Sequence, residues 1–421
     1  MRKKRAMNSR DFLKYAGIGG VMAFSGMPKI SWGQKPKEAV LGIVLPMTGP
    51  GGTWGQNIWP LLEIIRDEIN EAGGIKSLGG AKIRLVLLDS QTKPEVASRQ
   101  TEKLIDMQVA MILGSGHSAS TIVSSQLCEK NEYPNFCPGS LADEITDRGF
   151  KWNGALAPKM SWAGRDAVKF ALDMGKKTGY MPKKAGILVE DSPFGMRGGE
   201  AAKKTAQEAG LEIVDFVSYP AQSTTDFRSF ISKFKAAKLE VMFQANYAPD
   251  GVMITRQYKE LDFNPYGFIG MSGGHYTPEY LDMLKADANY TCCAVSANPD
   301  TPIPGSKELQ AKYIKKVGKP FDSTAGQWAT GLAVAVNVLE RTGTVTDRKA
   351  IRDAFRTTEL KAGEKYVMIV DGVKIDPETG RNMWAQNVMM EILNQDRRTV
   401  WPEKYKTVNP VWPMPKWSER K

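Results

Sequence analysis

A chain of 421 residues is long enough to form two ordinary domains, each with a core of its own. With 42% hydrophobic and 24% charged residues, the composition is typical of a globular protein and excludes a disordered chain. The formal net charge is +11, but residues 1–33 hold seven Lys or Arg and one Asp, so the rest of the chain carries only +5. Its Lys and Arg residues are spread among acidic ones, which argues against a nucleic-acid-binding protein.

The first 33 residues have the three parts of a secretory signal peptide. A basic start at 2–5 precedes a short, Gly-rich apolar run at 15–27, and Ser31 and Gly33 offer small residues for cleavage. Residues 8–14 resemble the twin-arginine export motif, except that Ser9 stands where its first arginine belongs. We therefore expect a signal peptide over 1–33, export by the Tat or the Sec route, and a soluble periplasmic or extracellular protein. The expected cleavage point has no cysteine near it, so we do not expect a lipid anchor.

After this segment the chain repeats the order strand, loop, helix as far as residue 137. Continuous apolar runs predict buried strands, and apolar residues at helical spacing predict helices between them. The predicted strands are 39–45, 82–88, 109–113 and 134–137, and the predicted helices cover 58–69, 94–107 and 120–130.

The same order restarts after residue 158. Strands separated by helices predict parallel sheets with helices on both faces, and two such runs predict two similar doubly wound α/β lobes. Beyond residue 297 the pattern is less regular, and the Trp- and Pro-rich stretch 401–417 is expected to pack in extended form across a lobe. The predicted strands are 186–189, 212–217, 241–244 and 268–270, and the predicted helices are 198–209, 227–235, 252–261, 324–341 and 347–355.

Six loops follow predicted strands, where a doubly wound sheet binds its ligand. They are rich in Gly, Ser and aromatic residues, which let backbone amides approach a ligand but also suit ordinary helix capping. Both histidines of the chain, His117 and His275, fall in these loops, with either a hydrogen-bonding role in a pocket wall or a purely structural one. The loops are 48–56, 114–120, 138–142, 191–195, 245–250 and 270–276.

The enzyme motifs in the chain are incomplete. Trp54 occupies the place of the third glycine of a dinucleotide-binding G-x-G-x-x-G loop, and no P-loop exists. Residues 270–274 match the G-x-S-x-G nucleophile elbow around Ser272, but His275 follows too soon and His117 precedes the serine, contrary to that family's order. Neither histidine has a carboxylate or cysteine at metal-ligand spacing. We expect no enzyme, no cofactor and no metal, with a serine hydrolase that uses Ser272 as the minor alternative.

The four cysteines contain no C-x-x-C pair. Adjacent Cys292 and Cys293 would face opposite sides of a strand and are poorly placed to bridge each other. A disulfide between Cys128 and Cys137 would be allowed in an exported protein. Buried thiols are the default expectation for all four.

Five stretches, in order along nearly the whole mature chain, resemble the branched-chain amino-acid-binding (Leu/Ile/Val-type) family of ABC-transporter periplasmic solute-binding proteins. The resemblance implies a type I periplasmic binding fold, in which two α/β lobes are joined by three crossing segments and close by a hinge motion on a ligand. It places the first lobe at 37–157 plus 298–388 and the second at 158–297 plus 389–421. The stretches are 41–56, 70–75, 113–121, 190–195 and 401–405.

Carried over position by position, the resemblance implies a ligand carboxylate held by Ser118 and nearby backbone amides. It also implies an aromatic wall and further contacts from the second lobe. With the two loop histidines, the expected ligand-binding residues are Trp54, His117, Ser118, Ala119, Ser140, Leu141, Phe194, Tyr247, Ser272 and His275.

Two departures from the family pattern bear on the ligand. Ser272 falls where amino-acid binders have a glutamate that pairs with the ligand ammonium, and Leu141 where they often have a threonine. A buried ammonium without a partner is costly. The expected ligand is therefore a small carboxylate or amide with an apolar or aromatic body, rather than an ordinary α-amino acid.

The expected protein is a monomeric receptor whose partners are a small-molecule ligand and an ABC permease in the inner membrane, with no nucleic acid. The same fold could instead serve as a ligand sensor that reports to a membrane regulator. The lack of any fused output domain in the sequence favours transport.

Overall fold

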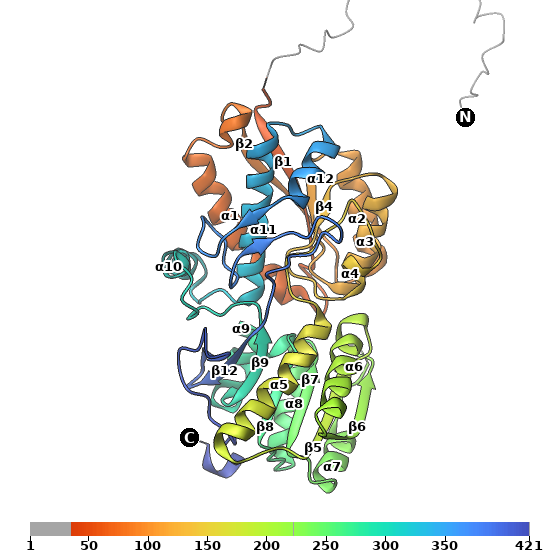
Figure 1. Cartoon of the computed structure of the whole chain (residues 1–421), viewed down its shortest axis with the longest axis vertical. Helices are drawn as coiled ribbons and strands as arrows, with labels where there is room; N and C mark the ends of the chain where they lie inside the picture. Colours follow the sequence, from red (N-terminus) through yellow and green to blue (C-terminus); the bar gives the residue numbers. More distant parts are fainter. Residues whose placement is uncertain (1–34, 222, 421) are drawn as a thin grey trace, which may run out of the picture. The chain divides into compact units, whose positions relative to one another are not determined.

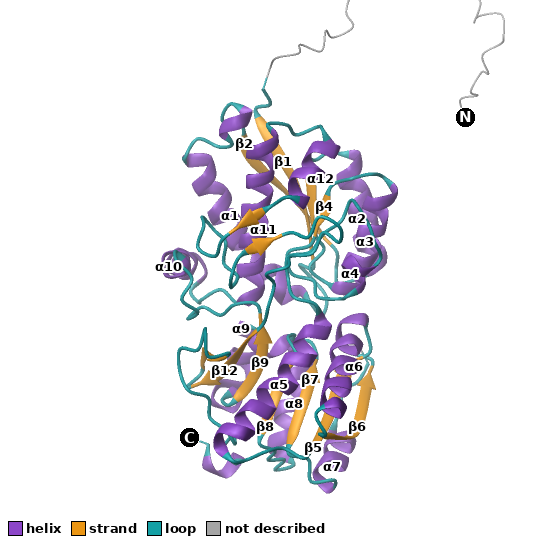
Figure 2. Ribbon diagram, in the orientation of Figure 1, coloured by secondary structure: helices purple, strands orange, loops and turns teal. Residues whose placement is uncertain are grey.

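The computed structural model describes residues 35–221 and 223–420, which form two α/β lobes, each built on its own sheet (Figures 1 and 2). The predicted signal peptide lies outside the described residues. Within the described part of the chain, no helix is both long enough and apolar enough to cross a bilayer.

The first lobe contains a four-stranded parallel sheet in the order β2-β1-β3-β4. Its strands are β1 (Glu38–Leu45), β2 (Lys82–Asp89), β3 (Met111–Leu113) and β4 (Asn135–Phe136). Its helices are α1 (Gly52–Glu71), α2 (Pro94–Asp106), α3 (Ser118–Lys130), α4 (Glu144–Asp147), α10 (Ser306–Val317), α11 (Ser323–Thr342) and α12 (Arg348–Arg356). A short hairpin joins β10 (Glu359–Leu360) to β11 (Val373–Lys374).

Strand β1 shows why this sheet is covered on both faces. Leu41 and Ile43 point into the core shared with α1 and α11, whereas Val44 points into a second cluster with Leu104 of α2. Successive side chains of a strand alternate between faces, so a strand covered on both sides must be apolar throughout. The continuous apolar run of β1 is the sequence feature that predicted it.

The second lobe contains a seven-stranded sheet in the order β13-β12-β9-β8-β7-β5-β6. Its strands are β5 (Lys184–Glu190), β6 (Glu212–Tyr219), β7 (Val241–Ala245), β8 (Gly267–Gly270), β9 (Thr291–Val295), β12 (Val388–Leu393) and β13 (Asp396–Trp401). Its helices are α5 (Met160–Thr178), α6 (Pro193–Glu208), α7 (Arg228–Ala236), α8 (Ala248–Glu260) and α9 (Pro278–Leu284).

The predicted parallel sheet is extended on one side by two antiparallel strands. Strands β5 to β9 pair in parallel, but β12 runs antiparallel to β9 and to β13. The chain enters β12 from the first lobe and turns back at Asn394 and Gln395, both at positive φ. A two-residue turn of this kind suits a tight hairpin, but its residues are not the usual Asn-Gly pair, so the hairpin could not be recognised from the residue types alone.

Four helices escaped prediction, the short α4 and α9 and the longer α5 and α10. The buried face of α5 is built largely from small residues such as Ala163, Gly164, Ala167 and Ala171, which give a weak apolar period. Gly164 lies so close to α6 that a Cβ atom there would stand 2.2 Å from the carbonyl oxygen of Gly198. Close helix packing, rather than bulky apolar side chains, therefore defines this face.

The four cysteines are free and buried, as expected by default. Cys137 Sγ accepts a hydrogen bond from the Ser140 amide at 3.2 Å, while Cys128 packs in a different cluster with Leu104, so the bridge between Cys128 and Cys137 does not form. Cys292 and Cys293 belong to different cores on the two faces of β9, as the strand prediction required.

The end of the chain packs against the second lobe, which confirms the expectation for the Trp-rich stretch. Trp412 covers Gly267 on β8 and packs edge-on against Phe170. The Trp417 indole donates to the Phe263 carbonyl at 2.9 Å. The chain crosses between the two sheets three times: near residue 158, after β9 and before β12. The residues that bound each lobe stay a prediction.

Candidate ligand-binding site

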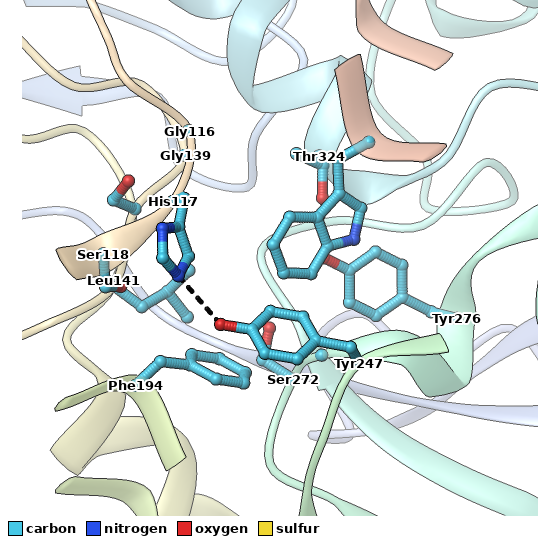
Figure 3. Close-up of a pocket in the computed structure, with 13 residues that line it drawn as sticks. Gly116, His117, Ser118, Gly139, Leu141, Phe194, Tyr247, Ser272, Tyr276 and Thr324 are labelled. Carbon is cyan, nitrogen blue, oxygen red and sulfur yellow. Dashed lines mark hydrogen bonds between the residues drawn. The ribbon is translucent and has the colours of Figure 1, made fainter. Parts of the chain in front are cut away.

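One pocket lies where helices of both lobes begin, and it contains about 320 Å³ of empty space. This volume includes space that is open to solvent. No described residue that lines it is charged at neutral pH. The lining residues are Trp54, Gly116, His117, Ser118, Gly139, Ser140, Leu141, Phe194, Tyr247, Ser272, Gly273, Tyr276 and Thr324 (Figure 3).

Eight of the ten residues expected at the site line this pocket, and Ala119 and His275 do not. Ala119 lies on α3 beside Ser118 but turns its side chain elsewhere. His275 is fully buried in η3 (Gly274–Tyr276), with its ring 5.4 Å from that of Tyr280. Positive φ angles of 70° at Ser272 and 93° at Gly273 turn the loop so that Tyr276, not His275, reaches the pocket.

Five residues that line the pocket were not predicted from the sequence. Gly116, Gly139, Gly273 and Tyr276 belong to the loops that were singled out, but only larger or family-matched side chains were chosen from them. Thr324 is different, because it begins α11 after a crossing between lobes rather than after a strand of the repeat. A predicted helix start near residue 324 was the available signal.

The N-terminus of α3 forms one side of the pocket. His117, its N-cap residue, contacts Ser120 Oγ through Nδ1 at 3.0 Å and the Tyr247 hydroxyl of the other lobe through Nε2 at 2.9 Å. Burial lowers the pKa of His117 to about 4, so the ring is neutral at pH 7. The helix has no side-chain cap and no acid in its first turn. Its positive end therefore faces the pocket without a compensating carboxylate.

Serine hydroxyls complete this side. Ser118 Oγ accepts a hydrogen bond from the Ala142 amide at 3.3 Å, and the hydroxyls of Ser140 and Thr121 lie 2.7 Å apart. Thr121 gives its proton to the His117 carbonyl at 2.9 Å, so Ser140 donates to Thr121 and keeps only acceptor capacity, whereas Ser118 keeps its proton for a further partner. At Gly139, an added Cβ would stand 3.0 Å from the Trp328 indole nitrogen, so glycine lets the backbone pass close to this ring.

The helices α6 and α11 also begin at the pocket, but their first amides are already bonded to side chains. Ser192 Oγ accepts from the Phe194 amide at 3.2 Å, and buried Glu190 accepts from the Gly195 amide at 2.8 Å. Burial raises the pKa of Glu190. Asp322 caps α11 by accepting from the Ala325 amide at 3.0 Å. Neither Glu190 nor Asp322 lines the pocket.

Aromatic rings form the wall between the lobes. The ring centroid of Tyr247 lies 5.4 Å from that of Trp54 and 6.1 Å from that of Phe194. All three side chains are more than 90% buried. Because Trp54 belongs to the first lobe and the other two to the second, a flat apolar group between the lobes would contact rings from both.

The opposite side of the pocket carries a second hydrogen bond between the lobes. The hydroxyls of Tyr276 and Thr324 lie 2.6 Å apart, and both residues are buried. Burial raises the pKa of Tyr276 far above its usual range, so its phenol stays neutral. Figure 3 shows His117 and Ser118 on one side, Tyr276 and Thr324 on the other, and the Tyr247 ring between them.

The geometry around Ser272 does not assemble the catalytic pair of a hydrolase. Among the described residues, no hydrogen bond joins the Ser272 hydroxyl to an imidazole, and His275 is buried beside Gly270 and Tyr280. Burial lowers the pKa of His275 to about 4. The described residues also contain no cluster of three or more His, Cys, Asp or Glu side chains that could hold a metal ion.

Two α/β lobes with a ligand-sized pocket between them define a two-lobed binding protein of type I fold. The sequence model of the periplasmic binding protein family matches residues 38–391, and the chain belongs to this family. This confirms the resemblance stated from the sequence.

Individual relatives agree with this assignment. Leu/Ile/Val-binding protein homolog 7 of Brucella melitensis is 29% identical over 381 residues, which cover 86% of this chain and 91% of the relative. The leucine binding protein LivK of Thermotoga maritima superposes with a TM-score of 0.75 at 21% identity, over 86% and 98% of the two chains. An ABC-transporter solute binding protein of Rhodopseudomonas palustris, solved with 3,4-dihydroxybenzoic acid, superposes with a TM-score of 0.72 at 21% identity, over 86% and 95%.

Proposed function

We propose that this protein is the exported solute-binding receptor of an ABC importer, and that its lobes close on a small organic ligand. The ligand has a carboxylate or amide head and an apolar or aromatic body. The observation that carries this proposal is the absence of any charged side chain among the described residues of the pocket, beside the uncapped N-terminus of α3.

An ordinary α-amino acid fits this pocket poorly. Its ammonium group would lose its water on binding and needs a carboxylate or several well-placed acceptors in return. The nearest acidic side chains are engaged elsewhere: Glu190 bonds the first amides of α6, and Asp322 caps α11 and faces buried Arg397. Ser272 offers only a neutral hydroxyl at the position where the amino-acid binders of this family have a glutamate.

A carboxylate fits the α3 side much better. The unpaired amides of a helix N-terminus and the helix dipole favour negative charge, and the Ser118 hydroxyl, which only accepts from the Ala142 amide, can donate its own proton. His117 is neutral, and its two ring nitrogens are already engaged by Ser120 and Tyr247, so it adds no charge to this side of the pocket. A neutral amide head could use the same donors at a lower gain, because hydrogen bonds to charged groups are stronger.

Closure of the lobes is supported by the contacts that already join them. His117 bonds Tyr247, and Tyr276 bonds Thr324, each pair crossing from one lobe to the other at the pocket. An exposed ion pair between Arg197 of α6 and Glu144 of α4 adds a third link at 2.6 Å. A ligand that supplies polar groups at the same places would favour the closed arrangement over an open one.

Export by the signal at 1–33, a monomeric state and a permease partner complete the proposal. A sensor of the same fold would use the same pocket, so ligand binding alone does not separate the two roles. Import of the identified ligand by cells that carry or lack this protein separates them.

A thermal-shift screen of the purified mature chain against amino acids, aliphatic and aromatic acids and amides tests the ligand class. We expect stabilisation by amine-free acids. Strong stabilisation by leucine or valine, with no response to acids that lack an amine, would overturn the proposal. An esterase assay with Ser272→Ala tests the absence of catalysis, and loss of a real esterase activity in that variant would contradict it.

A further inference from the structure

The side of the pocket opposite α3 is lined by hydroxyl groups from both lobes. Three hydroxyl groups meet there, those of Ser272, Tyr276 and Thr324. The hydroxyls of Tyr276 and Thr324 bond each other at 2.6 Å, and Ser272 lines the same pocket. All three residues line the pocket and are at least 95% buried.

We infer that the pair Tyr276–Thr324 determines specificity by binding a second polar group of the ligand, a neutral hydroxyl or carbonyl at the end opposite its carboxylate. This inference rests on the proposed function and adds the far end of the ligand to it. The ligand class that follows is a flat monoacid with a neutral hydrogen-bonding substituent at its distal end.

The arrangement of the pocket requires such a bipolar molecule. Each of the two hydrogen bonds between the lobes lies at one side of the pocket, His117–Tyr247 beside α3 and Tyr276–Thr324 across from it. The aromatic wall of Trp54 and Tyr247 lies between them. A ligand that contacts both pairs must therefore carry polar atoms at both ends and an apolar middle.

The second polar group must be uncharged. Asp322 lies at the N-cap of the helix that Thr324 enters, is fully buried, and already accepts from the Ala325 amide. A second carboxylate of the ligand would approach this buried acid and would find no free helix amides. A cationic group would find Asp322 already facing Arg397, which donates to the Tyr276 carbonyl at 2.9 Å. Neutral hydroxyl and carbonyl groups match the three hydroxyls without either cost.

The alternative is that the three hydroxyls satisfy only one another and face an apolar ligand end. A hydroxyl has one donor and two acceptor sites, so the bonded pair Tyr276–Thr324 keeps acceptor capacity and one donor unused, and Ser272 adds a third hydroxyl to the lining. Covering these sites with an apolar group would leave them unpaired and would disfavour binding. The two alternatives therefore predict opposite preferences for two ligands of equal size.

The test compares 4-hydroxybenzoate with 4-methylbenzoate by isothermal titration calorimetry, because hydroxyl and methyl groups have similar size. We expect the wild-type protein to bind 4-hydroxybenzoate about tenfold more tightly, the preference that one buried hydrogen bond provides. In Tyr276→Phe and in Thr324→Val the preference should fall toward one. Tyr133→Phe removes a buried hydroxyl that bonds the Val109 carbonyl away from the pocket, and it should keep the wild-type preference.

Equal or tighter binding of 4-methylbenzoate by the wild-type protein would overturn this inference while leaving the proposed ligand class intact. An unchanged preference in both variants would also overturn it. If neither acid binds but α-amino acids do, the proposed function and this inference fail together. Ser272→Ala provides a third variant should the other two not fold, and it should lower the preference as well.

Discussion

The helices α3 and α6 enter the pocket from opposite lobes, but they present different chemistry at their first turns. In α6, Pro193 lacks an amide hydrogen, Ser192 accepts from the Phe194 amide, and Glu190 accepts from the Gly195 amide. In α3, no side chain caps the first turn and no acid lies within it. The same element, a helix beginning after a strand, is therefore closed to a polar ligand in one lobe and open to it in the other.

This difference between α3 and α6 indicates which end of the ligand each helix would contact. An anionic head gains most at α3, where free amides and the helix dipole remain available. At α6 the pocket receives the Phe194 ring instead, which suits an apolar body. Family membership does not distinguish these two helices, because both follow strands of the same repeat; the distinction comes from the side chains of Glu190 and Ser192.

The largest effect is expected when α3 is given a carboxylate at its N-terminus, as α6 already has, because this removes the difference between the two helices. In Ser118→Asp the new acid would accept the first amides of α3 and repel an anionic ligand. We expect affinity for a carboxylate ligand to fall by at least about 100-fold. Calorimetry measures the change, and Ser306→Asp, at the same helix position in α10, provides a matched control. Unchanged affinity in Ser118→Asp would show that α3 does not hold the acid.

Binding of the apolar body of the ligand is expected to depend on the aromatic rings of the pocket wall. Trp54→Ala removes the first-lobe partner of Tyr247, and we expect affinity to fall roughly 10- to 100-fold because stacking area on the ligand body is lost. Trp59→Ala, in the same helix but outside the pocket lining, should retain near-wild-type affinity. Equal losses in both variants, measured by calorimetry, would point to a damaged α1 rather than to a binding wall.

Buried titratable groups on the two sides of the pocket should give opposite pH responses. The pKa of His117 is lowered to about 4, so between pH 4 and 6.5 the unfolded chain binds more protons and stability rises with pH. This contribution amounts to at most about 3 kcal/mol. In urea unfolding, the stability difference between the wild-type protein and His117→Asn should grow from pH 4.5 to 6.5. A constant difference would show that His117 is protonated equally in both states.

Asp250, in the first turn of α8, should act in the opposite direction. Burial, first of all, raises its pKa to about 7, and nearby Glu190 adds to this, whereas the Tyr219 hydroxyl bonds it at 3.3 Å and opposes the shift. The folded state thus keeps a proton that the unfolded chain releases near pH 4, so stability falls as pH rises from 4 to 7. Asp250→Asn should gain stability relative to the wild-type protein across this window. A gain that is flat with pH would contradict the assignment.

The elements that sequence predicted well are those whose environment repeats along the chain. Strands such as β1 and β7 are buried on both faces, so their residues are apolar throughout and readable without a structure. Trp54, Ser118 and Tyr247 lie in loops that follow strands, where a doubly wound sheet places its ligand loops, and the family resemblance selected them within those loops. The rest depended on tertiary placement. Thr324 reaches the pocket only because a crossing segment returns the chain to the first lobe.

His275 shows a second limit. It lies in the same loop as Ser272 and Tyr276, and a pattern of residue types cannot separate the three. Their directions depend on the backbone, where left-handed angles at Ser272 and Gly273 rotate the chain. A side chain at Gly273 would stand 2.4 Å from the Asn246 carbonyl oxygen, so this conformation also requires close approach of a neighbouring loop that is distant in sequence.

The central claim is that the pocket binds an acid head at α3 and has no partner for an ammonium. Calorimetric titration of the purified mature protein with 4-methylpentanoate and with L-leucine tests it most directly, because the two ligands differ only in the α-amine. The account predicts that 4-methylpentanoate binds more tightly, by about 100-fold or more, since the amine would be buried unpaired. Tight binding of L-leucine with little or no binding of 4-methylpentanoate would contradict it.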